Sequence, residues 1–339
     1  MRWNVTRHWI SNMSNCVGVL SNIPRLSYHL RMVLPNLTTS DILPGRNDTI
    51  IELSNAEVIV ADFDLLIPYV DHLPKTNWIQ GTWAGADKLL PHLYGKDVNY
   101  RITRFSGINF GMAMSEYVIS QIVNYERDQK RQYENQKSAA WIDDHKISKH
   151  RLIMDLTVGI LGVGTIGKSI AKTLKGFGAT IWGMNRMIPK EKLDFIDELR
   201  TTNSLNEILE NCDYIINILP STEESKGLLS GNVLEACKNK DTIFINIGRG
   251  SIINEKDLVN ALEQKWLSAA ILDVFENEPL PKSSKLWSMP QVNSDMVTIS
   301  PHVSGVTRPQ DVAKLFAENY ARYVKGEELL NILDINRGY

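Results

Sequence analysis

The sequence predicts an α/β protein made of two doubly wound domains, each built around a parallel β-sheet. Three observations support this fold class. Short apolar runs alternate with amphipathic helical patterns along most of the chain, which is typical of βαβ units and parallel strands. A glycine-rich turn joins one apolar run directly to a helical stretch. The length of 339 residues suits two domains of ordinary α/β size.

The first alternation predicts a smaller, flavodoxin-like domain. Its expected strands and helices, in chain order, are 16–21, 24–34, 57–61, 65–73, 78–83, 86–94 and 100–105. The last helical pattern of the chain begins with the capping-box sequence Thr307-x-x-Gln310 and stops at Gly326. No strand remains after it to build a domain, so we expect the chain to cross back. The smaller domain would then comprise residues 1–110 and 303–339.

The second alternation predicts a larger domain at residues 111–302. Its expected strands and helices are 156–161, 168–177, 180–183, 205–211, 214–219, 232–237, 242–247, 255–264, 269–275 and 297–300. A long helix near Met114 is apolar at first and becomes polar beyond Tyr125. We therefore expect residues 126–150 to form an exposed arm that could reach a second subunit. Trp141 lies within this arm and is expected to anchor packing.

The composition narrows the classes of function. The 37 basic and 39 acidic residues give a net charge of -2, which offers no reason to expect nucleic acid or a membrane surface as a partner. No apolar run approaches the ~18 residues of a membrane helix. Cys16, Cys212 and Cys237 form neither a disulfide framework nor a metal motif, and they suit a reducing compartment. We expect a cytoplasmic protein with no metal, although the acid-free residues 1–14, otherwise a loosely packed tail, leave a mitochondrial targeting segment open.

The apolar run 156–161 leads directly into Gly162-x-Gly164-x-x-Gly167, and the amphipathic stretch 168–177 follows. Strand, glycine turn and helix in this order form a dinucleotide-binding fingerprint and predict a Rossmann fold. The first glycine permits a tight turn, the second lets the backbone approach a pyrophosphate, and the third lets the helix pack close to the strand. The pyrophosphate would lie at the helix N-terminus, where N–H groups and the helix dipole favour an anion.

Two other interpretations of this turn stay open on the sequence. Gly162-x-x-x-x-Gly167-Lys168-Ser169 also satisfies the phosphate-loop pattern of ATPases and GTPases. Asp273, which follows an apolar strand, could then imitate the carboxylate that binds Mg²⁺ in those proteins. Alternatively, glycines between a strand and a helix simply make a tight turn.

The strand that follows the glycine turn predicts the choice of cofactor. A site for NAD expects an acidic residue about twenty positions past the glycines, where it binds the ribose 2′-hydroxyl. Here that strand ends in Asn185-Arg186, with Lys190 and Lys192 close behind. A guanidinium without a neighbouring carboxylate suits a 2′-phosphate, because Arg binds phosphate through paired, charge-assisted hydrogen bonds. The sequence therefore favours NADP(H), with NAD(H) as the other option.

Three chemically active residues follow expected strands of the larger domain. Arg249 stands between two glycines, Glu278 precedes a proline, and His302 follows the proline after the last strand. Open α/β sheets bind ligands at the carboxyl ends of their strands. A guanidinium, a carboxylate and an imidazole would therefore gather at one edge of the sheet. In the smaller domain, the turn at 81–87 occupies the equivalent place and contains small residues whose N–H groups could face an anion.

These segments resemble those of the D-isomer-specific 2-hydroxyacid dehydrogenases. The resemblance extends over nearly the whole chain, from about Cys16 to the C-terminal helix. It is carried by Gly85-Ala-Asp87, the glycine fingerprint, Leu219-Pro220, Gly248-Arg249-Gly250, Asp273-x-x-x-x-Glu278-Pro279, Leu286-Trp287 and Pro301-His302. The Asn185-Arg186 strand end is most similar to the glyoxylate/hydroxypyruvate reductase branch.

The resemblance implies catalytic roles for three residues. Arg249 would grip the substrate carboxylate and polarise the carbonyl group, because its fork matches a carboxylate. His302 would donate a proton to the carbonyl oxygen as hydride arrives. Glu278 would accept a hydrogen bond from the imidazole and fix its tautomer. Backbone N–H groups at Ala84 and Gly85 would hold the carboxylate of the substrate.

The resemblance also implies a cofactor site, in which Asp273 would meet the nicotinamide carboxamide. Trp83 departs from the family pattern, because it is bulkier than the residue expected in that loop, and it would narrow the pocket toward short keto acids. The residues expected around the cofactor are Gly162, Gly164, Thr165, Ile166, Gly167, Asn185, Arg186, Leu219, Pro220, Ile247, Gly248, Asp273 and His302.

The sequence therefore predicts an NADPH-dependent reductase of short 2-keto acids that yields D-2-hydroxy acids and works reversibly. The family implies a homodimer in which an aromatic residue of one subunit lies near the active site of the other, and Trp141 is the candidate by position. The alternative is a nucleotide-sensing binding protein or corepressor of the same fold, since such members keep the same Arg, Glu and His.

Overall fold

The computed structural model describes residues 16–189, 192–289 and 296–338. The expected tail at 1–14 and Lys190 lie outside these described residues. The chain divides into two compact units, Met1–Gly107 with Thr307–Tyr339 (unit 1) and Ile108–Val306 (unit 2). The chain passes from unit 1 to unit 2 after Gly107 and returns at Thr307. These boundaries lie a few residues from 110 and 303, where the sequence places them.

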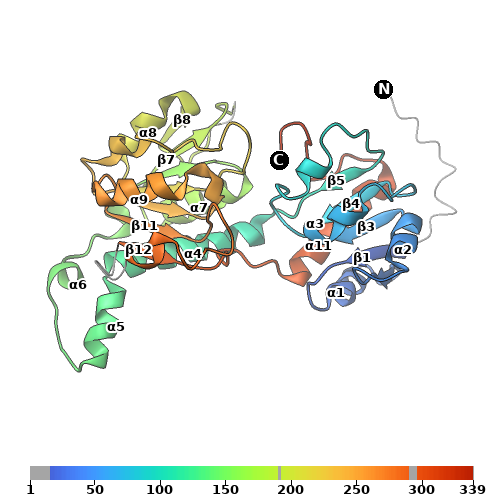
Figure 1. Cartoon of the computed structure of the whole chain (residues 1–339), viewed down its shortest axis with the longest axis horizontal. Coiled ribbons are helices and arrows are strands. Elements are labelled where there is room, and N and C mark those ends of the chain that lie inside the picture. The colour runs from blue at the N-terminus through green and yellow to red at the C-terminus, as the bar shows by residue number, and fades with distance from the viewer. Residues whose placement is uncertain (1–15, 190–191, 290–295, 339) are drawn as a thin grey trace. The chain divides into compact units, whose positions relative to one another are not determined.

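Unit 1 is built on a parallel sheet that has five strands among its described residues (Figure 1). They are β1 (Cys16–Leu20), β2 (Thr38–Asp41), β3 (Val58–Ala61), β4 (Trp78–Gly81) and β5 (Arg101–Thr103). Their order in space is β2-β1-β3-β4-β5, and every pair is parallel, which is the flavodoxin-like order. The prediction of a small doubly wound domain is therefore confirmed.

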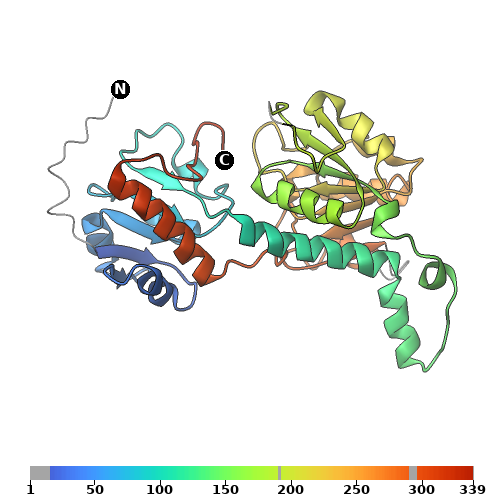
Figure 2. The ribbon, with the colours of Figure 1, turned by 180° about the vertical axis from the view of Figure 1, so that it is seen from behind.

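The helices of unit 1 cover this sheet on both faces. They are α1 (Leu26–Val33), α2 (Thr49–Asn55), α3 (Phe63–Leu66) and α11 (Pro309–Lys325). Figure 2 shows α11, the last helix of the chain, lying along the sheet beside strands from the N-terminal end of the chain. Trp78 of β4 stacks on Phe316 of α11, with ring centroids 5.1 Å apart and an interplanar angle of 6°. Burial of these two aromatic side chains fixes the returning helix to the sheet.

Two helices expected in unit 1 are wrong in extent. The pattern at 65–73 forms only the end of α3 and the 3₁₀ turn η2 (Ile67–Tyr69), and the pattern at 86–94 forms only the 3₁₀ turn η3 (Leu90–His92). Each turn has a proline at its centre, which lacks the N–H that a continuing helix needs and clashes with the preceding turn. The apolar periodicity still buries its side chains but cannot extend the helix.

The capping box expected at Thr307 and Gln310 is also wrong. Helix α11 begins at Pro309, after Arg308 in an extended conformation, and no side chain caps its first turn. Proline is favoured at the first helical position, because its missing N–H would have no helical partner there. The expected end is confirmed, since Gly326 closes the helix with a φ of 70°.

Unit 2 contains a parallel sheet for which the described ranges supply seven strands. They are β6 (Thr157–Leu161), β7 (Thr180–Asn185), β8 (Glu198–Thr201), β9 (Tyr214–Asn217), β10 (Ile243–Asn246), β11 (Ala269–Leu272) and β12 (Val297–Ile299). The order β12-β11-β10-β9-β6-β7-β8 reverses direction beside β6, as in the Rossmann fold. The predicted fold class is therefore confirmed for the larger domain as well.

Helices cover both faces of this sheet and make it the middle of three layers. They are α4 (Ile108–Glu126), α7 (Thr165–Gly176), α8 (Leu205–Asn211) and α9 (Glu255–Glu263). Successive residues of a strand point to opposite faces, so Ile243 and Ile245 of β10 pack with α4 and α7, whereas Phe244 packs with α8 and α9. The expected helix at 232–237 is only a 3₁₀ helix, η6 (Val233–Cys237).

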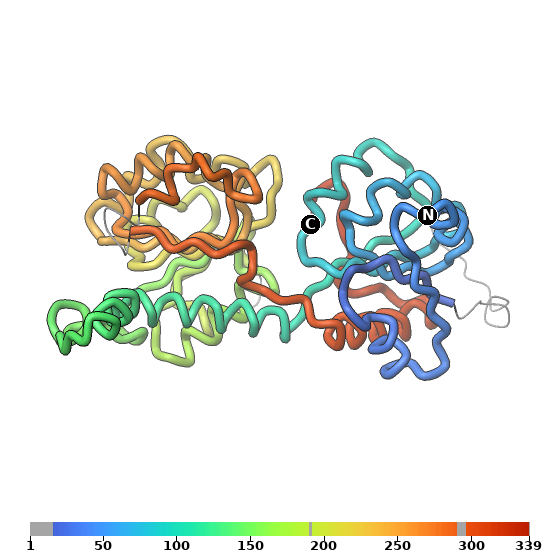
Figure 3. Tube along the Cα trace, turned by 60° about the horizontal axis from the view of Figure 1, so that its bottom comes forward, coloured from blue at the N-terminus to red at the C-terminus, as the bar shows by residue number. Residues whose placement is uncertain are grey.

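Beyond α4 the chain forms the arm that the polar sequence predicts (Figure 3). It contains α5 (Gln129–Lys137) and α6 (His145–Lys149), and neither helix has a buried residue. Trp141 between them is 99% exposed, so the expectation that it anchors packing is wrong within this chain. Among the described residues no helix combines the length and apolar character needed to cross a bilayer.

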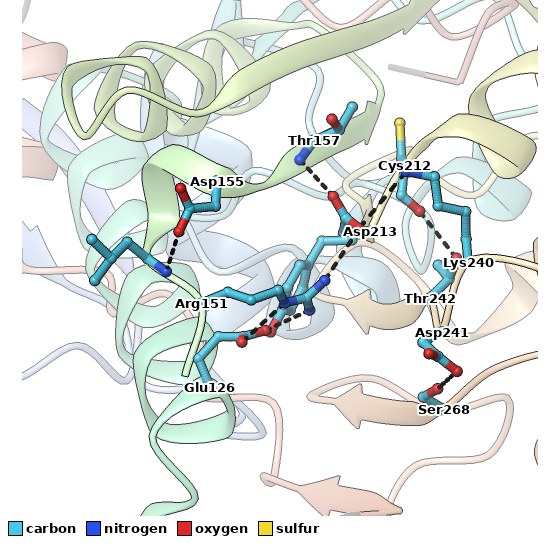
Figure 4. Close-up of polar contacts among 12 residues, drawn as sticks. Glu126, Arg151, Asp155, Thr157, Cys212, Asp213, Lys240, Asp241, Thr242 and Ser268 are labelled. Atoms are coloured by element: carbon cyan, nitrogen blue, oxygen red, sulfur yellow. Dashed lines mark hydrogen bonds and ion pairs between the residues drawn. The ribbon is translucent and has the colours of Figure 1, made fainter. Parts of the chain in front are cut away.

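A cluster of charged residues lies where the arm joins unit 2 (Figure 4). It is found where the strands of the unit 2 sheet begin, which we call the N-terminal edge of the sheet; the strands end at the C-terminal edge. Glu126, the last residue of α4, accepts hydrogen bonds from Arg151 Nη2 at 2.7 Å and from Tyr214 Oη at 2.7 Å. Arg151 Nη1 also reaches Asp213 Oδ1 at 3.2 Å, and Asp213 Oδ2 accepts from the backbone N–H of Thr157. Burial raises the pKa of Tyr214 well above its usual value, so its hydroxyl remains a donor.

Candidate active site

The glycine turn after β6 has the geometry that a dinucleotide requires. Gly162 has a φ of 106°, a conformation that L side chains rarely adopt. A Cβ atom at Gly167 would lie 2.0 Å from the carbonyl oxygen of Gly162, so only glycine lets α7 approach the strand this closely. A Cβ at Gly164 would meet nothing within 4 Å, which leaves open space beside the backbone where a pyrophosphate would lie.

The first turn of α7 continues this site. Gly164 occupies the N-cap position and no side chain caps the helix, so the first N–H groups are not claimed by a capping side chain. Thr165, the first helical residue, is exposed, and Ile166 is half-buried against the core. Backbone N–H groups at a helix N-terminus bind phosphate without any charged side chain. The residues present therefore fit the pyrophosphate of a dinucleotide.

The end of β7 is tied to the glycine turn. The N–H of Val163 donates to Asn185 Oδ1 at 2.9 Å. Because the amide oxygen faces this N–H, the amide nitrogen, a hydrogen-bond donor, lies on the other branch of the side chain. Arg186 follows and is paired with Glu224 in the loop after β9, with 3.0 Å between Nη2 and Oε2. Lys192, expected to add positive charge nearby, is exposed.

Two buried asparagines shape the turn that carries Arg249. Asn217 Nδ2, at the end of β9, donates to Asn246 Oδ1 at 2.9 Å, at the end of the neighbouring β10. Asn246 in turn accepts from the N–H of Gly248 and donates through Nδ2 to the carbonyl of Arg249. Asn217 Oδ1 also accepts from the N–H of Leu219 at 3.2 Å. The pair therefore fixes the backbone after two adjacent strands.

Close backbone packing joins the Arg249 turn to the loop that holds Glu278. A Cβ at Gly250 would lie 1.9 Å from the carbonyl carbon of Phe275, so no larger residue fits there. The N–H of Phe275 donates to Glu278 Oε1 at 2.9 Å. Arg249 is half-buried as a residue, and its Nη1 donates to the carbonyl of Gly248.

The structure brings Glu278 and His302 into direct contact. His302 Nδ1 lies 2.7 Å from Glu278 Oε2, and the side chains are 51% and 35% exposed respectively. His302 has a φ of 55°, a conformation that is uncommon for a non-glycine residue and that concentrates at functional sites. With Nδ1 facing the carboxylate, Nε2 is the ring nitrogen left to face a ligand.

Asp273 holds the loop that carries His302. Its side chain is completely buried, and its carboxylate accepts hydrogen bonds from Ser300 Oγ at 2.6 Å and from the N–H groups of Val303 and Ser304 at 2.8 Å each. Ser300 in turn lies 2.6 Å from the hydroxyl of Tyr117. Burial raises the pKa of Tyr117 to about 12, so this hydroxyl stays protonated near neutral pH.

In unit 1, the turn after β4 is held in a similar way. Asp62 is 3% exposed and accepts from Thr82 Oγ1 at 2.6 Å and from Ser21 Oγ at 2.6 Å. The carbonyls of Trp83 and Ala84 accept from Phe105 N and Arg104 Nη1, and Gly85 is half-buried. Each unit thus has a buried aspartate, one residue past a strand, that joins neighbouring loops.

The comparison with known families decides the identity of this fold. The family model described as "D-isomer specific 2-hydroxyacid dehydrogenase, NAD binding domain" matches residues 119–304, which is more than half of the chain. The chain belongs to this family. The glycine turn is therefore that of an NAD-binding domain, and the phosphate-loop interpretation is wrong.

Individual relatives agree with this family of dehydrogenases. Glyoxylate/hydroxypyruvate reductase A of Yersinia enterocolitica is 31% identical over 240 residues, which cover 70% of this chain and 72% of the relative. A D-isomer specific 2-hydroxyacid dehydrogenase family protein from Aeromonas salmonicida has a similar crystal structure, with a TM-score of 0.81, 32% identity, and coverage of 94% and 99%. An NADPH-dependent glyoxylate/hydroxypyruvate reductase from Sinorhizobium meliloti, crystallised with NADP and sulfate, gives a TM-score of 0.80, 25% identity, and coverage of 96% and 99%.

These likenesses confirm the predicted resemblance to the glyoxylate/hydroxypyruvate reductase branch. The protein is an enzyme of the 2-hydroxyacid dehydrogenase type. In the part of the chain that the structure describes, no group of three or more His, Cys, Asp or Glu side chains could hold a metal ion.

Four residues that support the loops of the candidate site were not predicted from the sequence. Asn217, Asn246, Ser300 and Tyr117 each make a hydrogen bond to a residue far away in the chain, which no local motif marks. Ile247 was expected to contact the cofactor, but its side chain is 3% exposed and packs in the core beneath the sheet edge. Only its backbone is available for that role.

Proposed function

We propose that this dehydrogenase reduces short 2-keto acids of the glyoxylate and hydroxypyruvate kind to D-2-hydroxy acids, with NADPH as the hydride donor and in a reversible reaction. One observation carries the proposal: Glu278 holds Nδ1 of His302, beside the turn that presents Arg249. Such a pair leaves Nε2 as the atom that exchanges a proton with a substrate oxygen.

The chain's own residues then divide the work of the reduction. When NADPH is bound, its nicotinamide supplies the hydride. Arg249 binds the substrate carboxylate through its fork and polarises the adjacent carbonyl. His302, protonated on both nitrogens, gives the Nε2 proton to the carbonyl oxygen, and Glu278 stabilises the ring while it carries positive charge. Carbonyl, hydride and proton together account for the alcohol, and reversal returns the proton to Nε2.

The end of β7 supports NADPH over NADH. An aspartate in place of Asn185 would present acceptor oxygens to the ribose 2′-hydroxyl of NADH. Its negative charge would repel the 2′-phosphate of NADPH. Here the amide nitrogen of Asn185 and the guanidinium of Arg186 are both groups that can donate hydrogen bonds to a phosphate, and Arg binds phosphate through paired contacts. The Sinorhizobium meliloti relative is NADPH-dependent and was crystallised with NADP, in agreement with this preference. NADH remains a weaker alternative.

Other roles stay proposals drawn from the resemblance. Ala84 and Gly85 would hold the substrate carboxylate through backbone N–H groups, and Trp83 would limit the size of the substrate. Asp273 would meet the nicotinamide carboxamide, although its oxygens already accept three hydrogen bonds within the chain. The exposed arm and Trp141 would contact a second copy of the chain in a homodimer, since a fully exposed indole leaves a large apolar surface in water.

A direct assay tests the proposed function. The purified protein is mixed with NADPH and a panel of 2-keto acids, NADPH oxidation is followed at 340 nm, and the configuration of the product is determined. We expect turnover with glyoxylate and hydroxypyruvate and D configuration in the chiral product. Tight NADPH binding without oxidation of the cofactor by any member of the panel would favour the binding-protein alternative instead.

A further inference from the structure

Arg186, the residue proposed to bind the 2′-phosphate, is paired with a carboxylate that the sequence did not single out. Glu224 Oε2 lies 3.0 Å from Arg186 Nη2, and the two side chains are 68% and 45% exposed. Glu224 belongs to the loop after β9, whereas Arg186 follows β7. The two residues meet because of the strand order of the sheet, in which β6 alone lies between β9 and β7.

The turn that carries Glu224 is held by its own hydrogen bonds. Ser225 is 7% exposed, and its Oγ donates to the carbonyl of Pro220 at 2.6 Å and accepts from the N–H of Thr222 at 2.8 Å. The neighbouring Glu223 is paired with Lys226 at 2.6 Å. The backbone at Glu224 is thus fixed relative to the strand ends, and its carboxylate is directed to Arg186 rather than to a lysine of its own loop.

The charges indicate what this pair does when the cofactor arrives. An ion pair between exposed side chains is weak. A phosphate carries nearly two negative charges and binds a guanidinium through two hydrogen bonds, so it will displace Glu224 from Arg186. Glu224 nevertheless stays close, because its turn is fixed, and its charge repels the phosphate. The carboxylate therefore opposes the phosphate both by occupying Arg186 and by repulsion.

We propose that Glu224 is a specificity-determining residue that competes with the 2′-phosphate for Arg186 and so limits the preference of the enzyme for NADPH over NADH. This inference rests on the proposed function, in which Arg186 binds the 2′-phosphate. The adenosine of NADH has a neutral 2′-hydroxyl, so the charge of Glu224 has little effect on its binding. Removal of this charge should strengthen the binding of phosphorylated cofactor selectively.

Equilibrium binding to the full chain tests this role without catalysis. Adenosine 2′,5′-bisphosphate and 5′-AMP, which differ only by the 2′-phosphate, are titrated into wild type, Glu224→Gln and Glu223→Gln by calorimetry at low salt. We expect Glu224→Gln to bind the bisphosphate about 3- to 10-fold more tightly, as a charge a few ångströms from a phosphate in water implies, and 5′-AMP unchanged. The matched Glu223→Gln variant, whose carboxylate is already paired with Lys226, should bind both as wild type does.

A double variant tests whether Glu224 acts by competing with the phosphate for Arg186. In an Arg186→Gln background, Glu224→Gln should have less than half of its effect, because the contact for which it competes is gone. Weaker or unchanged bisphosphate binding by Glu224→Gln, or an equal gain in Glu223→Gln, would overturn the proposal. A failure of the proposed function differs from these outcomes: the wild type itself would then not prefer the bisphosphate to 5′-AMP, or would not oxidise NADPH with any 2-keto acid.

Discussion

The sheet of unit 2 has charged side chains at both of its edges, and the two sets differ in how their charges are satisfied. At the N-terminal edge, Glu126 is only 6% exposed and is bound by Arg151 (Figure 4) and by Tyr214. At the C-terminal edge, Glu278 engages one nitrogen of His302, and the imidazole side chain stays 51% exposed. Both edges pair a carboxylate with a basic residue. At the C-terminal edge, however, Nε2 of the half-exposed imidazole remains able to exchange a proton with a ligand.

This difference shows why residue type alone does not mark an active site. Removing one partner of a buried carboxylate strongly destabilises a protein, because an unpaired charge is then left in the interior. A half-exposed pair contributes little to stability and remains able to exchange a proton with a ligand. Substitutions at the two edges should therefore separate, with activity lost at one edge and stability lost at the other.

The largest effect is expected at the C-terminal edge. His302→Ala should lower kcat by about 100-fold or more, because a positioned general acid contributes roughly 10²- to 10⁴-fold. Its melting temperature should stay near that of wild type, since the side chain is half-exposed. Steady-state assays with NADPH and calorimetry measure the two quantities, and the exposed His92→Ala serves as the control. Near-normal turnover of the His302 variant would refute its role.

The reverse pattern is expected at the N-terminal edge. Arg151→Met should reduce the free energy of unfolding by about 3 kcal/mol, at the low end for breaking a buried pair, because Arg151 itself is partly exposed. That loss corresponds to roughly 6 to 12 °C in melting temperature, with kcat of the folded protein unchanged. Lys238→Met, which breaks an ion pair with Glu235 between side chains that are 52% and 44% exposed, should cost no more than about 1 kcal/mol. Equal losses in the two variants would contradict the distinction between the edges.

Arg249→Lys tests whether the fork of the guanidinium matters at the C-terminal edge. A lysine keeps the charge but loses one of two paired hydrogen bonds to the substrate carboxylate. A hydrogen bond to a charged group is worth about 1.5 to 3 kcal/mol, so kcat/KM should fall roughly 10- to 100-fold. Titration with NADPH should show unaltered cofactor affinity. A variant with wild-type kcat and KM for the keto acid would show that Arg249 does not bind the substrate.

The smallest of these effects is a loss of stability at Tyr117 of α4, which contacts the C-terminal edge through Ser300. Tyr117→Phe removes the hydroxyl next to Ser300 and should lower the free energy of unfolding by about 1 kcal/mol at neutral pH. Because burial raises the pKa of Tyr117 to about 12, folding disfavours its phenolate. Its hydroxyl therefore stabilises the fold fully below pH 10, and this contribution declines as the pH rises from 10 to about 12. Chemical denaturation at pH 8 and pH 11 should show the difference from wild type shrinking, and a constant difference would be evidence against this assignment.

The strands that sequence reasoning missed are both polar edge strands. β2 (Thr38–Asp41) and β8 (Glu198–Thr201) have no apolar alternation, and none of their residues is buried. They exist because β1 and β7 offer unpaired backbone groups for them to bind. By contrast, the buried strands of both sheets are apolar runs bounded by polar turns, and their own residues were enough to predict them.

The sequence by itself determined the order of the buried apolar strands, the glycine turn, and the placing of Arg249, Glu278 and His302 just beyond strand ends. These features depend on neighbouring residues: on periodicity, on the absence of a Cβ, and on the rule that parallel strands end at one edge. Only the tertiary structure decided which distant groups meet there, such as Asn217 with Asn246 and Arg186 with Glu224. Those contacts follow from the order and register of the strands, which bring together loops that are far apart in the chain and share no local pattern.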